Sequence, residues 1–137
     1  MPTHDEDAAL EVLFHPFATG ALAWPEEGGA LFLRARDGWP LHARALPGLV
    51  AEQTWKPAFD ALARSNIDVR ADAVAGTFPL VMVLPPRQRD EARALFARAL
   101  EQAGATGTVI ACMPNDEGAK TGQADLARLA GPVSVLS

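Results

Sequence analysis

The most constraining feature of the sequence is residues 80–84, Leu-Val-Met-Val-Leu, a run that is apolar on both of its faces. Such a strand must be covered on both faces, as a central strand of a parallel sheet is by helices. Pro85 and Pro86 end the run, because proline cannot donate to a strand ladder. A second run of this kind covers residues 108–112. We therefore predict two buried strands of one parallel sheet.

The segment between these two runs has the period of an amphipathic helix. Its apolar positions recur at steps of three and four residues, and they are Ala92, Leu95, Phe96, Ala99, Leu100 and Ala103. The remaining positions include the charged residues Arg89, Glu91, Arg93, Arg98 and Glu101. Gly104 is a typical helix stop. Strand, helix and strand in this order predict a right-handed crossover on a parallel sheet.

The rest of the chain adds weaker elements to this unit. We expect a first helix that has Thr3 and Glu6 at capping-box spacing and ends before Pro16. A strand at 30–33 and an irregular connection at 37–50 with a short helix or strand follow. We then expect a helix from Thr54 that stops at Asn66, and an outer strand at 67–70. A further helix from about Thr121, closed by Gly131 and Pro132, and a strand from Val133 complete the prediction. The expected fold is a single α/β domain over residues 1–137, with three layers and helices on both faces of a mostly parallel sheet.

Composition limits the classes of protein. A chain of 137 residues has room for one core, and its net charge of -5 disfavours nonspecific binding to nucleic acid. Cys112 is the only cysteine, so no internal disulfide can form. The first residues are acidic, unlike a secretory signal, and no apolar run is long enough for a membrane span. We expect a cytoplasmic protein without a membrane partner.

Motifs for catalysis and cofactor binding are missing. The turns after residues 33, 84 and 112 carry no glycine fingerprint, which a dinucleotide or nucleoside site needs for close approach of the backbone. Gly118-Ala119-Lys120-Thr121 lacks the earlier glycine of a phosphate loop, so it is better explained as a turn before a helix cap. The three histidines have no partner at metal-ligand spacing. We predict no catalytic residue, no cofactor and no metal in this chain.

One basic feature could contact phosphate. Arg87, Arg89 and Arg93 begin the helix that follows the central strand, at the edge where parallel sheets bind ligands. Together with Asn115 and Lys120 they are our candidates for RNA or phosphate contact. The alternative is a solvated helix face whose arginines pair with neighbouring acids.

A family resemblance rests on residues 78–87, on the Arg/Ala/Leu helix after them, and on residues 115–121 with their Gly-x-Lys-Thr turn. These segments resemble the N-terminal half of class I S-adenosylmethionine (SAM)-dependent methyltransferases related to the bacterial small-subunit ribosomal RNA guanine-N(2) enzymes. The resemblance implies a Rossmann-like fold and a degenerate, noncatalytic N-terminal domain of a longer methyltransferase that takes part in rRNA processing. Its partners would be the C-terminal methyltransferase domain of the same chain and ribosomal RNA, and SAM would bind to the parent protein.

The sequence departs from that family at its catalytic motif. The family's Asn-Pro-Pro-aromatic motif is absent, since Pro85 and Pro86 stand between Leu84 and Arg87. Two alternatives therefore stay open. One is a free-standing α/β protein or enzyme that binds a small ligand near residues 85–89 and 115–120. The other is an assembly or dimerisation module anchored by Trp24, Trp39 and Trp55.

Overall fold

The computed structural model describes residues 4–114, 124–128 and 134–136. Its elements are helix α1 (His4–Thr19), strand β1 (Ala30–Leu33), 3-10 helix η1 (Trp39–Leu41), β2 (Leu49–Glu52), α2 (Lys56–Arg64), β3 (Val69–Arg70), β4 (Leu80–Val83), α3 (Arg89–Ala103), β5 (Thr108–Pro114), β6 (Ala124–Arg128) and β7 (Ser134–Leu136).

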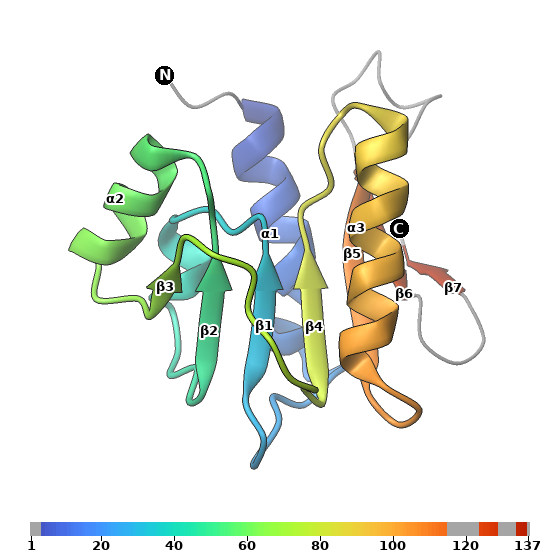
Figure 1. Cartoon of the computed structure of the whole chain (residues 1–137). Coiled ribbons are helices and arrows are strands. Elements are labelled where there is room, and N and C mark those ends of the chain that lie inside the picture. The colour runs from blue at the N-terminus through green and yellow to red at the C-terminus, as the bar shows by residue number, and fades with distance from the viewer. Residues whose placement is uncertain (1–3, 115–123, 129–133, 137) are drawn as a thin grey trace.

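The seven strands of the described residues form one sheet in the order β3-β2-β1-β4-β5-β6-β7 (Figure 1). The first five strands run parallel, whereas β6 is antiparallel to β5 and β7 is antiparallel to β6. Leu33, the last residue of β1, pairs with Glu52 of β2 and with Val83 of β4. The carboxyl ends of these three strands therefore lie level at one edge of the sheet. The predicted mostly parallel sheet is confirmed.

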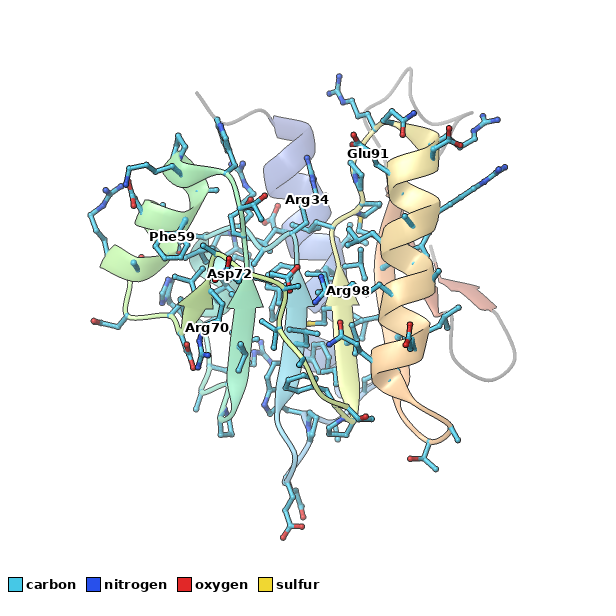
Figure 2. All side chains as sticks on the ribbon, viewed as in Figure 1. Arg34, Phe59, Arg70, Asp72, Glu91 and Arg98 are labelled. Atoms are coloured by element: carbon cyan, nitrogen blue, oxygen red, sulfur yellow. The ribbon has the colours of Figure 1, made fainter. Side chains whose placement is uncertain are left out.

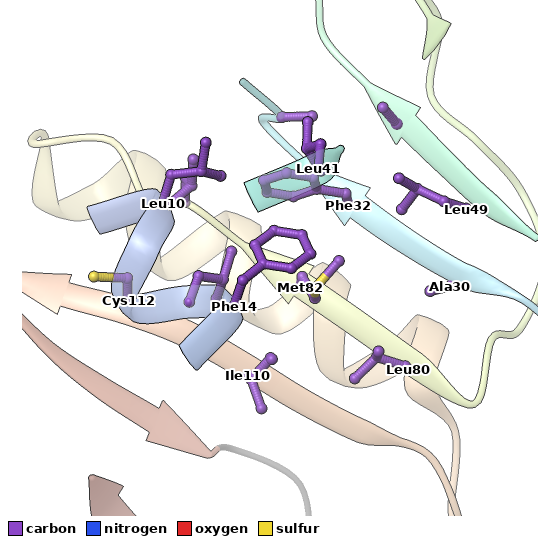
Figure 3. Packing of buried hydrophobic residues seen from close by; sticks show 14 of the residues in the cluster. Leu10, Phe14, Ala30, Phe32, Leu41, Leu49, Leu80, Met82, Ile110 and Cys112 are labelled. Atoms are coloured by element: carbon purple, nitrogen blue, oxygen red, sulfur yellow. The ribbon is translucent and has the colours of Figure 1, made fainter. Parts of the chain in front are cut away.

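Helices cover both faces of the sheet, with α1 on one face and α3 on the other (Figure 1). Alternate residues of the central strands supply the two cores. Phe32 and Met82 pack on the α1 side (Figure 3), whereas Leu31 and Val81 pack on the α3 side. The Phe32 side chain is fully buried, and burial of one such ring contributes about 2–3 kcal/mol. The three-layer, Rossmann-like arrangement predicted from the sequence is confirmed.

Helix α3 follows the predicted pattern closely. Gln88 precedes the helix, and its side-chain oxygen accepts a hydrogen bond of 2.6 Å from the backbone N–H of Glu91. Ala99 and Ala103 are buried against the sheet, and Gly104 ends the helix with a φ of 67°. Leu100 departs from the expected core face, because 42% of its surface is exposed.

The first helix is longer than predicted. Pro16 lies inside α1, which continues to Thr19. A proline in a helix removes one backbone hydrogen bond. Here Phe17, one residue beyond the proline, is buried and packs on Phe14 with a ring-centroid distance of 6.1 Å. The apolar surface buried after Pro16 offsets the lost hydrogen bond, so the helix does not stop there.

The predicted helix from Thr121 is wrong in its described part, because residues 124–128 form strand β6. These residues pair antiparallel with β5, from Ile110 opposite Arg128 to Pro114 opposite Ala124. Backbone hydrogen bonds along the free edge of β5 outweigh a weak helical pattern. The predicted final strand is confirmed as β7. Within the described residues, no helix is long and apolar enough to cross a membrane.

Two connections complete the frame of the site. The predicted irregular stretch at 37–50 contains both η1 and the start of β2. The predicted helix stop is confirmed at Asn66, which has a φ of 63°, and the outer strand is confirmed as β3. Residues 71–79, which join β3 to β4, contain no helix and pass in front of the sheet (Figure 1).

Candidate functional site

A cleft of about 540 Å³ lies at the carboxyl ends of the central strands. The chain leaves β1 toward the α1 side of the sheet, where Leu41 is buried, and leaves β4 toward the α3 side. Neighbouring strands whose connections diverge in this way form the switch point at which open α/β sheets bind ligands. The cleft is lined by Arg34, Glu52, Gln53, Thr54, Trp55, Pro86, Glu91, Ala94, Leu95 and Arg98.

Arg34 occupies the turn directly after β1, and its backbone has a φ of 56°. Left-handed backbone is unusual for a residue other than glycine and costs about 1–2 kcal/mol. The guanidinium Nη1 donates to the carbonyl oxygens of Leu84 at 3.3 Å and Pro85 at 3.5 Å. The side chain thus joins the end of β1 to the end of β4 (Figure 2). A glycine-rich cofactor turn would leave this space open.

Glu52 ends β2 and is buried. Its Oε1 accepts from the backbone N–H of Val74 at 2.8 Å and from Arg98 Nη2 at 2.6 Å, and its Oε2 accepts from Arg98 Nη1. Burial raises the pKa of Glu52, but the hydrogen bonds from Arg98 and Val74 and the charge of Arg98 together lower it below its ordinary value. In dinucleotide-binding folds an acid near this place binds a ribose hydroxyl. Here the Glu52 carboxylate instead forms an ion pair with Arg98.

Arg98 reaches Glu52 from α3 across the front of the sheet (Figure 2). Its Nη2 also donates to the carbonyl oxygen of Val74 at 3.0 Å, and Gln102 Nε2 donates to the same oxygen at 2.7 Å. The hydrogen bond to Glu52 raises the pKa of Arg98, although burial opposes this. The network fastens residues 71–79, the helix-free connection, to α3. Sequence reasoning placed Arg98 among the charged residues outside the apolar face and missed this role, because its partner Glu52 lies 46 residues away in the chain.

The mouth of the cleft is formed by the residues between β2 and α2. The backbone N–H of Trp55 donates to Gln53 Oε1 at 2.9 Å, and Gln53 Nε2 donates to the carbonyl oxygen of Ala35 at 2.7 Å. These bonds hold the turn at the strand edge. The Trp55 side chain itself is 67% exposed. An aromatic side chain that is both held at its backbone and open to solvent is a feature of binding surfaces.

The predicted basic residues lie at the same edge of the sheet. Arg87, Arg89 and Arg93 are exposed at the start of α3, and none of them forms a hydrogen bond or ion pair within the described part of the chain. Their exposure also fits the solvated-face alternative, although the pairing with neighbouring acids is not seen in the described part of the chain. Asn115 and Lys120 lie outside the described residues.

Two further sequence predictions concern metals and the tryptophans. Among the described residues no group of three His, Cys, Asp or Glu side chains could hold a metal ion. Trp24 is engaged within the fold, since its Nε1 donates to the carbonyl oxygen of Pro47 at 2.9 Å and its ring lies 5.5 Å from that of Phe17. Trp39 and Trp55 are the exposed members of the predicted trio.

Comparison with solved structures identifies the fold. The chain is similar to the 16S rRNA N2 methyltransferase RsmC of T. thermophilus, solved with AdoMet and guanosine, with a TM-score of 0.64 and 19% identity over 94% of this chain. The fold is that of the class I SAM-dependent methyltransferases. The glycopeptide N-methyltransferase MtfA, complexed with SAM, matches with a TM-score of 0.59 and 21% identity over 94% of this chain. The CcbJ methyltransferase of Streptomyces caelestis matches with a TM-score of 0.61 and 13% identity over 99% of it.

These matches are similarities of fold between chains of different length. The present chain spans 38% of the RsmC chain, 65% of the MtfA chain and 74% of the CcbJ chain. No protein-family model matches the sequence, and no curated protein matches it significantly.

Proposed function

We propose that this chain is a noncatalytic domain of a SAM-dependent methyltransferase of the ribosomal RNA guanine-N(2) type. In this role it supports the catalytic domain of the same protein and helps to place the RNA. One observation carries the proposal: the two strand-end positions that a nucleoside cofactor needs are occupied by Arg34 and by the Glu52–Arg98 ion pair.

The pairing of the lining charges also disfavours SAM. Glu52 and Arg98 pair with each other, so the buried acid at the end of β2 is not free for a cofactor, and Arg34 and Glu91 are the two charged lining residues that remain. A cofactor that used the Glu52 carboxylate would first have to separate it from Arg98, and the free energy lost with that ion pair would reduce its net affinity.

The supporting role is proposed from the relation to the longer ribosomal enzyme. The chain spans 38% of that enzyme and has its fold. A domain with this fold and a blocked cofactor site can still stabilise a second, catalytic domain by packing against it. We therefore propose the C-terminal methyltransferase domain of the same protein as the main partner, SAM as its cofactor and the cytoplasm as its location.

The RNA role is proposed from the exposed arginines at and just before the start of α3. Arg87, Arg89 and Arg93 present unpaired guanidinium groups at the edge of the sheet, within a chain whose net charge is -5. Guanidinium groups bind phosphate through paired hydrogen bonds. A few basic residues on an acidic domain can position a phosphate backbone, while the net negative charge limits nonspecific binding of nucleic acid to the rest of the surface.

Isothermal titration calorimetry of this chain with SAM tests the noncatalytic assignment. We expect no heat of binding at concentrations that saturate an active methyltransferase titrated in parallel. Stoichiometric binding of SAM would overturn the assignment, because it would show that the cleft admits the cofactor.

Salt-dependent RNA binding by the native full-length protein tests the RNA role. Replacing both Arg87 and Arg89 by Ala should weaken binding and reduce the slope of log K against log salt by about 1.4–1.8, the value for two lost phosphate contacts. The matched control replaces the exposed Arg44 and Arg64, which lie away from the cleft, and should leave the slope unchanged. An equal slope in the Arg87/Arg89 variant and the wild type contradicts the RNA role.

A further inference from the structure

We propose that the cleft beside Trp55 and Arg34 binds an unpaired nucleotide, with its base stacked on the Trp55 indole and its phosphate held by the Arg34 guanidinium. The inference rests on the proposed function, because it requires a cleft that SAM does not fill. It deepens that function by assigning a ligand class to the cleft itself.

The shape and lining of the cleft suit a flat aromatic ligand. Its volume of about 540 Å³ lies within the range of small-molecule sites. Trp55 lines one part of it, and the apolar side chains of Pro86, Ala94 and Leu95 line another. Because every base has a π face, an exposed indole can stack with a base of any sequence. The hydrogen bond from the backbone of Trp55 to Gln53 fixes the turn that carries the indole.

Arg34 is an anchored donor. Its Nη1 is held by the carbonyl oxygens of Leu84 and Pro85. Nε and Nη2 make no hydrogen bond within the described part of the chain, and the residue is exposed. A guanidinium that is already fixed loses less conformational entropy when it binds. The free donors match the oxygens of a phosphate group.

The charges around the cleft favour an anion. Four charged side chains line it, and two of them, Glu52 and Arg98, neutralise each other. Arg34 then faces a single remaining acid, the exposed Glu91. The exposed Arg87, Arg89 and Arg93 at the same edge add positive charge, and Asp90 is the other exposed acid at the start of α3. A phosphate with an attached base fits this balance better than a cationic sulfonium does.

The other exposed tryptophan offers a matched control. Trp39 is 64% exposed, close to the 67% of Trp55. It borders a smaller hollow of about 170 Å³ between α1 and η1. Trp39→Ala therefore removes an equally exposed indole without changing the cleft, so it controls for general effects of losing a surface tryptophan.

Calorimetry with three probes tests the inference: guanosine monophosphate, guanosine and a short single-stranded RNA. We expect Trp55→Ala to weaken nucleotide binding by about 10-fold or more, Trp55→Phe to retain most of the affinity because its ring still stacks, and Trp39→Ala to bind as the wild type does. Glycine adopts left-handed backbone without strain, so the Arg34→Gly variant should fold. It should bind guanosine monophosphate about 10-fold more weakly, whereas its affinity for guanosine should change little.

The probes also separate the sources of the ligand. Tighter binding of the RNA than of the monophosphate supports a strand as the natural ligand, and equal binding supports a free nucleotide. The inference is overturned if neither the RNA nor the monophosphate binds, or if the wild type and Trp55→Ala bind them with equal affinity. If neither SAM nor any nucleotide binds, this inference fails while the proposed function stands. If SAM binds, the proposed function itself fails.

Discussion

Arg98→Ala should destabilise the domain far more than its position on a surface helix suggests. Arg98 donates two hydrogen bonds to Glu52 and one to the carbonyl oxygen of Val74. After the substitution the Glu52 carboxylate keeps the backbone N–H of Val74 as its described hydrogen-bond partner. An almost buried carboxylate would then lose its counterion, because the Glu52 side chain is only 11% exposed.

The size of the loss follows from the burial of the pair. An exposed ion pair contributes about 0–1 kcal/mol, whereas loss of one partner from a buried pair costs about 3–5 kcal/mol. The Arg98 side chain is 28% exposed, so solvent screens the pair in part. We therefore expect the lower end of the buried range, about 3 kcal/mol. With a urea dependence of about 2 kcal/mol per M, the unfolding midpoint should fall by about 1.5 M.

Urea denaturation followed by circular dichroism measures this loss. The matched control is Arg93→Ala on the same helix, which should change the free energy of unfolding by less than about 0.5 kcal/mol. The double change Glu52→Gln with Arg98→Met removes both charges and should recover a large part of the loss. A cost below about 1 kcal/mol for Arg98→Ala would refute the reasoning, because the pair would then behave as a surface ion pair.

Two further predictions concern pH and backbone packing. The folded-state pKa of Glu52 is lowered from its ordinary value of 4.5, so its stabilising contribution is complete above that pH and is lost as the pH falls through the folded pKa. The free energy of unfolding should therefore decline more steeply in acid for the wild type than for Glu52→Gln, in urea titrations from pH 6 to about pH 3; parallel profiles contradict this. Gly107→Ala places a Cβ in steric overlap with the carbonyl oxygens of Ala103 and Phe78, so we expect thermal unfolding to show that the free energy of unfolding falls by about 2 kcal/mol or more. The exposed neighbour Thr106→Ala should have little effect, and similar stability of the two variants would contradict the predicted clash.

The candidate site could be predicted from the sequence only in part. The sequence shows that the turn after residue 33 lacks a glycine fingerprint, and the structure places Arg34 in that turn with a positive φ. The Glu52–Arg98 pair was not predictable in this way. The partners are 46 residues apart in the chain. Nothing in the local pattern of either helix or strand says which acid an arginine will meet.

The exposed arginines and the tryptophans show the same limit. Periodicity alone could not distinguish Arg98, which is paired and largely buried, from Arg93, which is exposed on the same helix. Likewise Trp24 and Trp55 look alike in sequence, yet one packs on Phe17 and the other stands open at the cleft. Whether a side chain is exposed depends on which distant residues the fold brings against it.

Local sequence by itself determined the central architecture. Runs such as 80–84, apolar on both faces, can be stabilised only inside a covered parallel sheet, and the spacing of apolar residues in α3 leaves one face to cover it. Tertiary structure decided the rest: the course of α1 through Pro16, the antiparallel β6 in place of a helix, and the ion pair that occupies the cleft. In each of these cases the local preference is weak, and contacts between residues distant in the chain contribute the larger free energy.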